Sequence, residues 1–154
     1  MRAVPTIFEP EPSSRENGAE GEEEFLVHCL RKELNVRLSL GPYSNCDFKI
    51  CGKKIDVKTI SNDYGPSPDF NVNVPSCQVS LDQDLFAFVF HDRFKGTYTI
   101  AGAVDRITLL RKARLMRKGE AERNGDFRYK CDTYVLKVKE LLPVEALVGL
   151  KLSE

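Results

Sequence analysis

Residues 46–60 constrain the fold of this chain more than any other segment. They alternate apolar and polar side chains on either side of Gly52, which predicts two short strands joined by a tight turn. Because successive side chains of a strand point to opposite faces, Asp56 and Lys58 share one face of the second strand. Pairing across the turn is expected to bring Asp47 close to both. Two carboxylates and an ammonium group are costly to desolvate unless a cation or a polar substrate occupies the patch, so we predict a functional site here.

The composition indicates one globular domain preceded by an acidic arm. The chain has 154 residues, of which 42% are hydrophobic and 30% are charged, as in ordinary soluble proteins. Its formal net charge is zero, but residues 1–24 hold seven acidic and two basic side chains. Their net charge of −5 leaves +5 for the rest of the chain. We therefore expect a flexible acidic arm over residues 1–20 and a moderately basic domain over residues 21–154.

The cysteines and the apolar segments bear on the cellular compartment. The five cysteines are an odd number and lack the Cys-x-x-Cys spacing of zinc and iron–sulfur sites. We therefore expect free thiols in a reducing compartment. No apolar run is long enough to span a membrane, and residues 1–18 lack the apolar centre of a secretory signal. These features predict a cytoplasmic or nuclear protein without a membrane partner.

The pattern of the whole chain predicts an α/β fold. An amphipathic helix is expected over residues 22–35, with Glu23 at the centre of the stripe that includes Leu26 and Leu30. The continuous apolar run at 85–91 is typical of a strand buried on both faces. Further strands are expected at 36–40, 97–104 and 134–138, and further helices at 76–83 and 105–118. Together these elements predict a central mixed sheet with helices on both faces.

This order of elements resembles the core of the PD-(D/E)XK nuclease superfamily, which includes restriction enzymes, Holliday-junction resolvases and phage nucleases. A helix with an inward glutamate precedes a strand with Asp47, and the next strand carries Asp56-Val57-Lys58. Asp-x-Lys alone is a weak signal, but an aspartate nine positions earlier across a glycine turn makes the pattern more specific. Asp47 follows a cysteine, not the proline of the family motif. The resemblance spans roughly residues 21–104 and implies a single-domain restriction-endonuclease-like fold.

By this resemblance, Asp47, Asp56 and Glu23 would be catalytic acids that bind a metal, and the Val57 carbonyl would add a backbone oxygen. Oxygen ligands without histidine or thiolate suit Mg²⁺, or Mn²⁺, and not zinc. Lys58 would orient the attacking water or stabilise the transition state at phosphorus. The resemblance therefore implies a Mg²⁺-dependent deoxyribonuclease, either an endonuclease or a junction resolvase. It leaves a homodimer open.

Several polar and basic residues outside the hairpin are candidate contacts to DNA phosphates or bases. They come from the basic helix, the turn after the buried strand, the loop before it and the short helix that follows this loop: Arg111, Lys112, Arg114, Arg93, Lys95, Asn71, Asn73 and Gln78. Tyr64 and Tyr43 flank the hairpin in sequence and are candidates for stacking on bases.

Other interpretations fit the same residues. The three charged groups of the hairpin also suit a solvated cross-strand ion pair. Glu23, like Glu22 and Glu24, also suits the N-terminus of a helix, where negative charge is favourable. The chain would then be a catalytically inactive protein of the nuclease fold that binds nucleic acid. An exonuclease or a ribonuclease would use the same site, and a protein-interaction role for the acidic arm is a further alternative.

Overall fold

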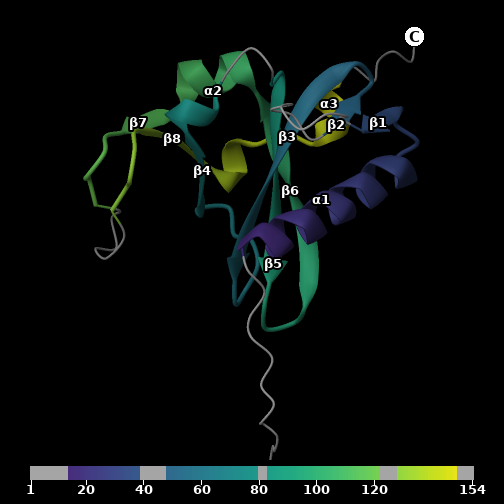
Figure 1. Cartoon of the computed structure of the whole chain (residues 1–154), viewed down its shortest axis with the longest axis horizontal. Helices are drawn as coiled ribbons and strands as arrows, with labels where there is room; N and C mark the ends of the chain where they lie inside the picture. The colour runs from purple at the N-terminus through teal and green to yellow at the C-terminus, as the bar shows by residue number, and fades with distance from the viewer. Residues whose placement is uncertain (1–13, 39–47, 80–82, 122–127, 149–154) are drawn as a thin grey trace, which may run out of the picture.

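A mixed five-stranded sheet forms the centre of the protein (Figure 1). The structure is a computed structural model and describes residues 14–38, 48–79, 83–121 and 128–148. The strands of the central sheet are β1 Val36–Leu38, β2 Phe48–Ile50, β3 Lys53–Asn62, β5 Leu85–Asp92 and β6 Thr97–Asp105. Their order across the sheet is β1-β2-β3-β5-β6, and all neighbours are antiparallel except β3 and β5, which are parallel.

A second sheet of three strands, in the order β4-β8-β7, lies beside the first, at the left in Figure 1. Three α-helices and two short 3₁₀ turns complete the described part of the chain. The bounds of these elements are β4 Asn71–Pro75, β7 Arg114–Met116, β8 Thr133–Lys137, α1 Ser14–Arg31, α2 Arg106–Lys112, α3 Val144–Leu147, η2 Ser76–Gln78 and η3 Val138–Glu140. The α/β class predicted from the sequence is confirmed. No helix in the described ranges combines the length and the apolarity that crossing a membrane requires.

The predicted central hairpin is confirmed over its described part. Cys51 and Gly52 join β2 to β3 with φ angles of 50° and 83°. A two-residue hairpin loop with positive φ at both positions matches the right-handed twist of the flanking strands. The register sets Phe48 opposite Ile55. Asp47, the first acid of the predicted site, lies outside the described residues.

The predicted buried strand is β5, in which every side chain from Leu85 to Phe90 is buried. Because β5 runs parallel to β3, the chain must cross from one end of the sheet to the other between them. This crossover contains β4 and η2. The helix predicted over 76–83 is thus a single 3₁₀ turn, Ser76–Gln78, in its described part, and residues 80–82 lie outside it.

The two helices α1 and α3 cover one face of the central sheet (Figure 1). Their side chains Phe25, Cys29 and Val144 form a buried cluster with Ile55 and Val57 of β3. This cluster removes apolar surface from water and is the first of two hydrophobic cores. It also fixes the orientation of β3, because residues that alternate with Ile55 and Val57 must point to the opposite face.

The opposite face of the central sheet is covered mainly by the second sheet. Phe86, Phe88 and Phe90 of β5 pack with Val72 and Val74 of β4 in a second core, to which α2 and β8 also contribute. The expectation of helices on both faces is therefore only partly met. The second sheet pairs residues that are far apart in the sequence, such as Asn71 of β4 and Lys137 of β8. Local hydrophobic periodicity carries no information about such pairing.

The basic helix predicted over 105–118 is shorter than expected. Asp105 caps its first turn as predicted, and its carboxylate accepts a hydrogen bond from the Thr108 backbone N–H at 3.1 Å. The helix ends at Lys112, because Ala113 is extended and β7 follows. Leu115, which falls within the range predicted as helix, instead lies opposite Tyr134 in the β7–β8 ladder and is 39% exposed.

The helix α1 begins at Ser14, within the segment expected to form the flexible arm, and not at Glu22. Its closest approach to the sheet is at Gly21. A Cβ at this position would lie 1.9 Å from Thr59 Oγ1 of β3. The buried side of α1 therefore runs through Gly21, Phe25 and Cys29, whereas Leu30, assigned to that side from the sequence, is 55% exposed.

Candidate active site

Asp56 and Lys58 form an ion pair on the face of β3 that points away from α1. They alternate with Ile55 and Val57 along the strand, and Lys58 Nζ lies 3.0 Å from Asp56 Oδ2. The two side chains are only 14% and 20% exposed. Removing one partner of such a poorly solvated pair leaves an uncompensated charge, which is strongly destabilising. The adjacency of Asp56 and Lys58 that the sequence predicted is present in the structure.

Gln78 joins this pair from the second sheet's side of the molecule. Its side-chain oxygen Oε1 accepts a hydrogen bond from Lys58 Nζ. Gln78 ends η2, and this turn is anchored where the Ser76 backbone N–H donates to the Asp132 carbonyl at 2.8 Å. The structure thus places Gln78, which the sequence suggested as a DNA contact, against the ammonium group. The ammonium group of Lys58 is thus held by two oxygen acceptors, the Asp56 carboxylate on β3 and the side-chain oxygen of Gln78 in the crossover.

The oxygen atoms of this cluster are of the type that binds hard divalent cations. Asp56 supplies a carboxylate and Gln78 an amide oxygen, and both are oxygen donors of the type that Mg²⁺ prefers. In the ranges that the structure describes, no group of three or more His, Cys, Asp or Glu side chains could hold a metal ion. A complete carboxylate set here would have to include Asp47, which is outside those ranges.

The predicted orientation of Glu23 is wrong. Glu23 and Glu24 are exposed, and Glu22 is the half-buried acid of this turn. The reason is the contact of Gly21 with Thr59, which turns the helix so that the next residue, Glu22, flanks the sheet. The apolar stripe of the sequence predicted the wrong rotation of the helix about its axis, because Gly21 has no apolar side chain and was not counted in the stripe. Its close approach to the sheet nevertheless determines that rotation.

A cleft of about 830 Å³ opens between the two sheets on the face that carries Asp56 and Lys58. It is lined by Ile60 and Phe90 of the central sheet and by Asn73, Arg114 and Lys137 of the second sheet. We call it the inter-sheet cleft. Its full lining is Ile60, Asn62, Tyr64, Asp69, Phe70, Asn71, Asn73, Phe90, Arg114, Met116, Ala121, Tyr129 and Lys137.

Some of these lining residues were predicted as nucleic-acid contacts and others were missed. Asn71, Asn73 and Arg114 were predicted, and the structure brings all three to the cleft. Lys137 and Tyr129 were not. The sequence contained a hint of the position of Lys137, because it falls on the same face as Val135 in a strand pattern. Its place in the cleft, opposite Asn71, follows only from the register of β4 with β8.

The electrostatic character of the cleft is positive. Asp69, the one acid among its described lining residues, forms an ion pair with Lys139 at 3.1 Å. The hydrogen bond from this ammonium group and its charge hold the pKa of Asp69 below its usual value, so the carboxylate is ionised and already matched. Lys137 also acts on this carboxylate, more weakly than Lys139, and Arg114 and Lys137 together leave the lining of the cleft with a positive balance that favours anions.

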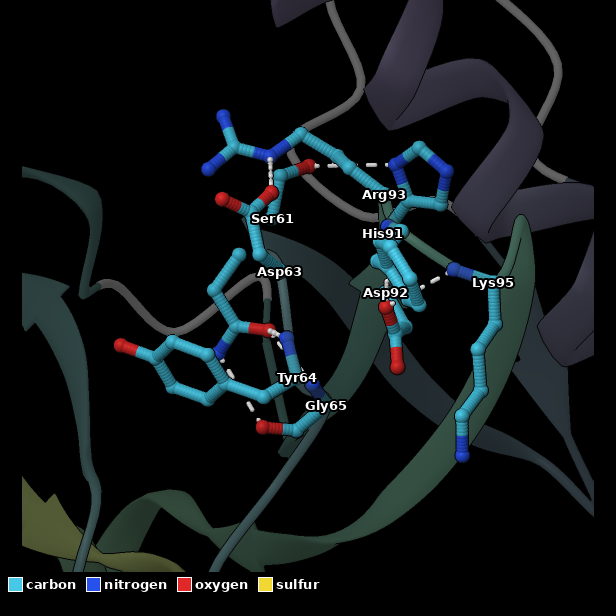
Figure 2. A network of polar contacts seen from close by, with 10 residues as sticks. Ser61, Asp63, Tyr64, Gly65, His91, Asp92, Arg93 and Lys95 are labelled. Carbon is cyan, nitrogen blue, oxygen red and sulfur yellow. Dashed lines mark hydrogen bonds and ion pairs between the residues drawn. The ribbon is translucent and has the colours of Figure 1, made fainter.

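The parallel strands β3 and β5 end side by side in matching turns, which shape one end of the cleft (Figure 2). The side-chain oxygen of Asn62 accepts hydrogen bonds from the backbone N–H groups of Tyr64 at 3.0 Å and Gly65 at 2.6 Å. One carboxylate oxygen of Asp92 accepts in the same way from Phe94 and Lys95. Such local side-chain bonds stop a strand and fix the following turn.

The remaining predicted DNA contacts lie away from the lining of the cleft. Arg93 extends toward Asp63, with its Nε at 3.0 Å from the carboxylate, while Lys95 points away from this pair (Figure 2). Both belong to the exposed turn between β5 and β6. Arg111 and Lys112 are exposed in the last turn of α2.

A comparison with models of known protein families and with curated proteins gives no match for this sequence.

Proposed function

We propose that the protein is a metal-dependent nuclease that hydrolyses phosphodiester bonds in DNA. The observation that carries this proposal is the poorly solvated Asp56–Lys58 pair on β3, held by Gln78 and lying on the same face of β3 as Ile60, which lines the positively charged cleft. A solvated surface ion pair would not be expected to lie 14% and 20% exposed at the junction of two sheets.

The topology supports the same proposal. A helix, an antiparallel hairpin and a strand parallel to the second arm of the hairpin follow one another in the order that the PD-(D/E)XK resemblance implies, although β4 and a single 3₁₀ turn stand in the described part of the crossover where the resemblance implies a helix. The Asp-x-Lys element lies on the strand that pairs with this parallel partner, β5. We therefore propose a restriction-endonuclease-like fold for residues 21–104, with the second sheet as an addition to it.

The donor set assigns roles to particular residues. Asp56, together with Asp47 and the Val57 carbonyl, would hold a Mg²⁺ ion. In place of Glu23 we assign Glu22 as the acid from α1, because it is half-buried and follows the contact of Gly21 with β3. In the described part of the chain β2 pairs with β3 only as far as Ile55, so a side chain of α1 can reach past this open edge of β3 to the face that carries Asp56. A bound Mg²⁺ supplies neutralisation of phosphate charge and a more acidic water.

The chain's own contribution centres on Lys58. Asp56 and Gln78 hold its ammonium group in one position before any substrate arrives. A preorganised cation stabilises the negative charge that develops on the phosphate oxygens, and it needs no rearrangement during the reaction. The ammonium group can also orient the attacking water by donating a hydrogen bond to it, or donate a proton to the leaving oxygen.

The test of this proposal is cleavage of a substrate panel with the full chain. Linear, nicked, branched and single-stranded DNA and matched RNA are incubated with Mg²⁺, with Mn²⁺ and with EDTA. We expect metal-dependent cleavage of DNA, and its loss in Asp56→Asn. Binding without cleavage, equal in Asp56→Asn and the natural chain, would instead identify a catalytically inactive nucleic-acid-binding protein and would overturn the proposal.

A further inference from the structure

Two cations of the inter-sheet cleft stand on neighbouring strands of the second sheet. Arg114 of β7 lies opposite Val135 of β8, and Lys137 follows Val135 by two positions on the same face of β8. Both side chains line the cleft. Because Asp69 is matched by Lys139, these two charges suit an anionic ligand such as a phosphate.

A buried polar atom lies in the same cleft. Asn73 Oδ1 is buried, and no hydrogen bond reaches it from the described residues. A buried acceptor without a hydrogen bond is unfavourable, so a ligand that donates to it gains affinity. If the oxygen and nitrogen of the Asn73 amide were exchanged, the unsatisfied atom would be a donor nitrogen, and a ligand that carries acceptors would gain affinity instead. The edges of nucleobases carry both kinds of group.

An aromatic group stands at the mouth of the cleft. Tyr64 is 68% exposed and packs edge-on against Phe70, with ring centroids 5.4 Å apart. Its backbone is fixed by the hydrogen bonds to Asn62 that end β3 (Figure 2). A large exposed aromatic ring held on a rigid turn is a platform on which an unpaired base can stack.

The lining of the cleft begins two residues along β3 from the candidate active site. Ile60 lines the cleft and follows Lys58 by two positions on the same face of β3. The rise of a strand puts these two positions roughly 6.6 Å apart. A polynucleotide bound in the cleft would therefore present a neighbouring phosphate at Lys58.

We propose that the inter-sheet cleft binds one nucleotide of an unpaired nucleic-acid strand next to the bond to be cut. This inference rests on the proposed function and deepens it by naming the substrate class. Arg114 and Lys137 hold the phosphate, the Asn73 amide reads an edge of the base, and Tyr64 stacks on the adjacent base. A paired base cannot offer its pairing edge to a buried amide, so the substrate is single-stranded at this position. The volume of about 830 Å³ falls within the range of about 300–1,000 Å³ for small-ligand pockets.

The experiment measures binding without cleavage. A fluorescently labelled single-stranded DNA oligonucleotide is titrated with the full chain in EDTA, and anisotropy is followed at several salt concentrations. The duplex of the same sequence and a nucleoside monophosphate serve as competitors. The variants are Lys137→Ala, Arg114→Ala and Asn73→Leu, and the matched control is Lys53→Ala, which removes the same charge from an exposed lysine outside the lining of the cleft. Circular dichroism establishes that each variant is folded.

The expected results are specific to the cleft. Lys137→Ala and Arg114→Ala each weaken single-strand binding by about tenfold, since each removes a charged hydrogen bond. Each also lowers the slope of log affinity against log salt by about 0.7, the value for one phosphate contact in a single strand. Lys53→Ala leaves affinity and slope unchanged, and the duplex and the nucleoside monophosphate compete poorly.

The results that would overturn the inference are equally definite. Equal effects of Lys137→Ala and Lys53→Ala would exclude the cleft as the binding site. Equal competition by the duplex would exclude an unpaired strand, and equal competition by the nucleoside monophosphate would identify a site for free nucleotides. Because the assay needs no metal and no cleavage, a failed nuclease assay with intact binding removes only the proposed function. Cleavage with cleft-independent binding removes only this inference.

Discussion

Gly21 shows how a single residue sets the position of α1. A Cβ at Gly21 would lie 1.9 Å from Thr59 Oγ1 and 3.0 Å from Thr59 Cβ, so the helix approaches β3 more closely than any other residue type permits. In a helix, replacing glycine by alanine ordinarily stabilises by about 1 kcal/mol. At this contact the sign is expected to reverse.

We predict that Gly21→Ala destabilises the protein by about 1–3 kcal/mol, because the added methyl group overpacks the contact. In a Thr59→Ala background the same substitution is expected to cost less, since the clashing Oγ1 is gone. That atom is buried without a hydrogen bond from the described residues, so removing it leaves no partner unsatisfied. Urea unfolding of the four proteins in this double-mutant cycle measures the coupling. Additive effects would show that Gly21 does not contact Thr59.

The acids that follow Gly21 differ in burial, and we expect them to differ in function. Glu22 is half-buried and Glu23 is exposed. Glu22→Gln is therefore predicted to reduce metal-dependent cleavage by about 100-fold, the lower end of what a positioned catalytic group contributes. Glu23→Gln removes the same charge from the next residue and is expected to change cleavage by less than about twofold. The opposite ranking in a single-turnover assay would restore Glu23 as the acid of α1.

At the scale of elements, sequence periodicity predicted those parts whose pattern is local. The hairpin turn at Gly52 and the buried strand from Leu85 to Phe90 follow from alternation and from an uninterrupted apolar run, which need no knowledge of distant residues. The second sheet could not be predicted in this way. β4 has a strand pattern, but only its register with β8, such as Val72 opposite Leu136, makes it a sheet. Likewise, the helix pattern beyond Lys112 yields to pairing of β7 with β8.

Helix α3 is attached to α1 by charges as well as by its apolar face. Glu145 of α3 lies 3.6 Å from His28 Nε2 and 3.5 Å from Lys32 Nζ. Burial acts to raise the pKa of Glu145, but a hydrogen bond from its own backbone N–H and the charges of His28 and Lys32 outweigh it. The pKa of Glu145 therefore lies below its usual value.

This shift predicts a pH dependence of stability. A carboxyl group whose pKa is lower in the folded state stabilises above its unfolded-state pKa of about 4.3, and the stabilisation is lost as the pH falls through the folded value. Glu145→Gln is thus expected to lower the melting temperature at about pH 5.5, and by progressively less as the pH falls toward 3. Thermal unfolding monitored by circular dichroism checks this. A difference that stays constant down to pH 3 would contradict an ionised Glu145 as the source.

At the scale of the whole molecule, the candidate site exists only because two sheets meet. Asp56 and Lys58 are neighbours on one strand, and their adjacency was predictable from period-two alternation. Gln78 reaches Lys58 only through the crossover that carries β4 and η2. The cleft beyond them has one wall from each sheet. The sequence therefore indicated the charged pair of the candidate site, Asp56 and Lys58, whereas the surface that would select a substrate depends on long-range strand pairing.

The central claim is that Lys58 is catalytic and is not simply one half of a structural ion pair. Its most direct test is the single-turnover rate of DNA cleavage with Mg²⁺, with enzyme in excess, for Lys58→Met and for Lys53→Met. Lys53 lies on the same strand, is exposed and points to the opposite face, so its variant controls for loss of one charge from β3. We predict that Lys58→Met lowers the rate by about 100-fold or more with DNA binding retained, and that Lys53→Met leaves it unchanged. Equal rates for the two variants, at equal binding, would contradict the account.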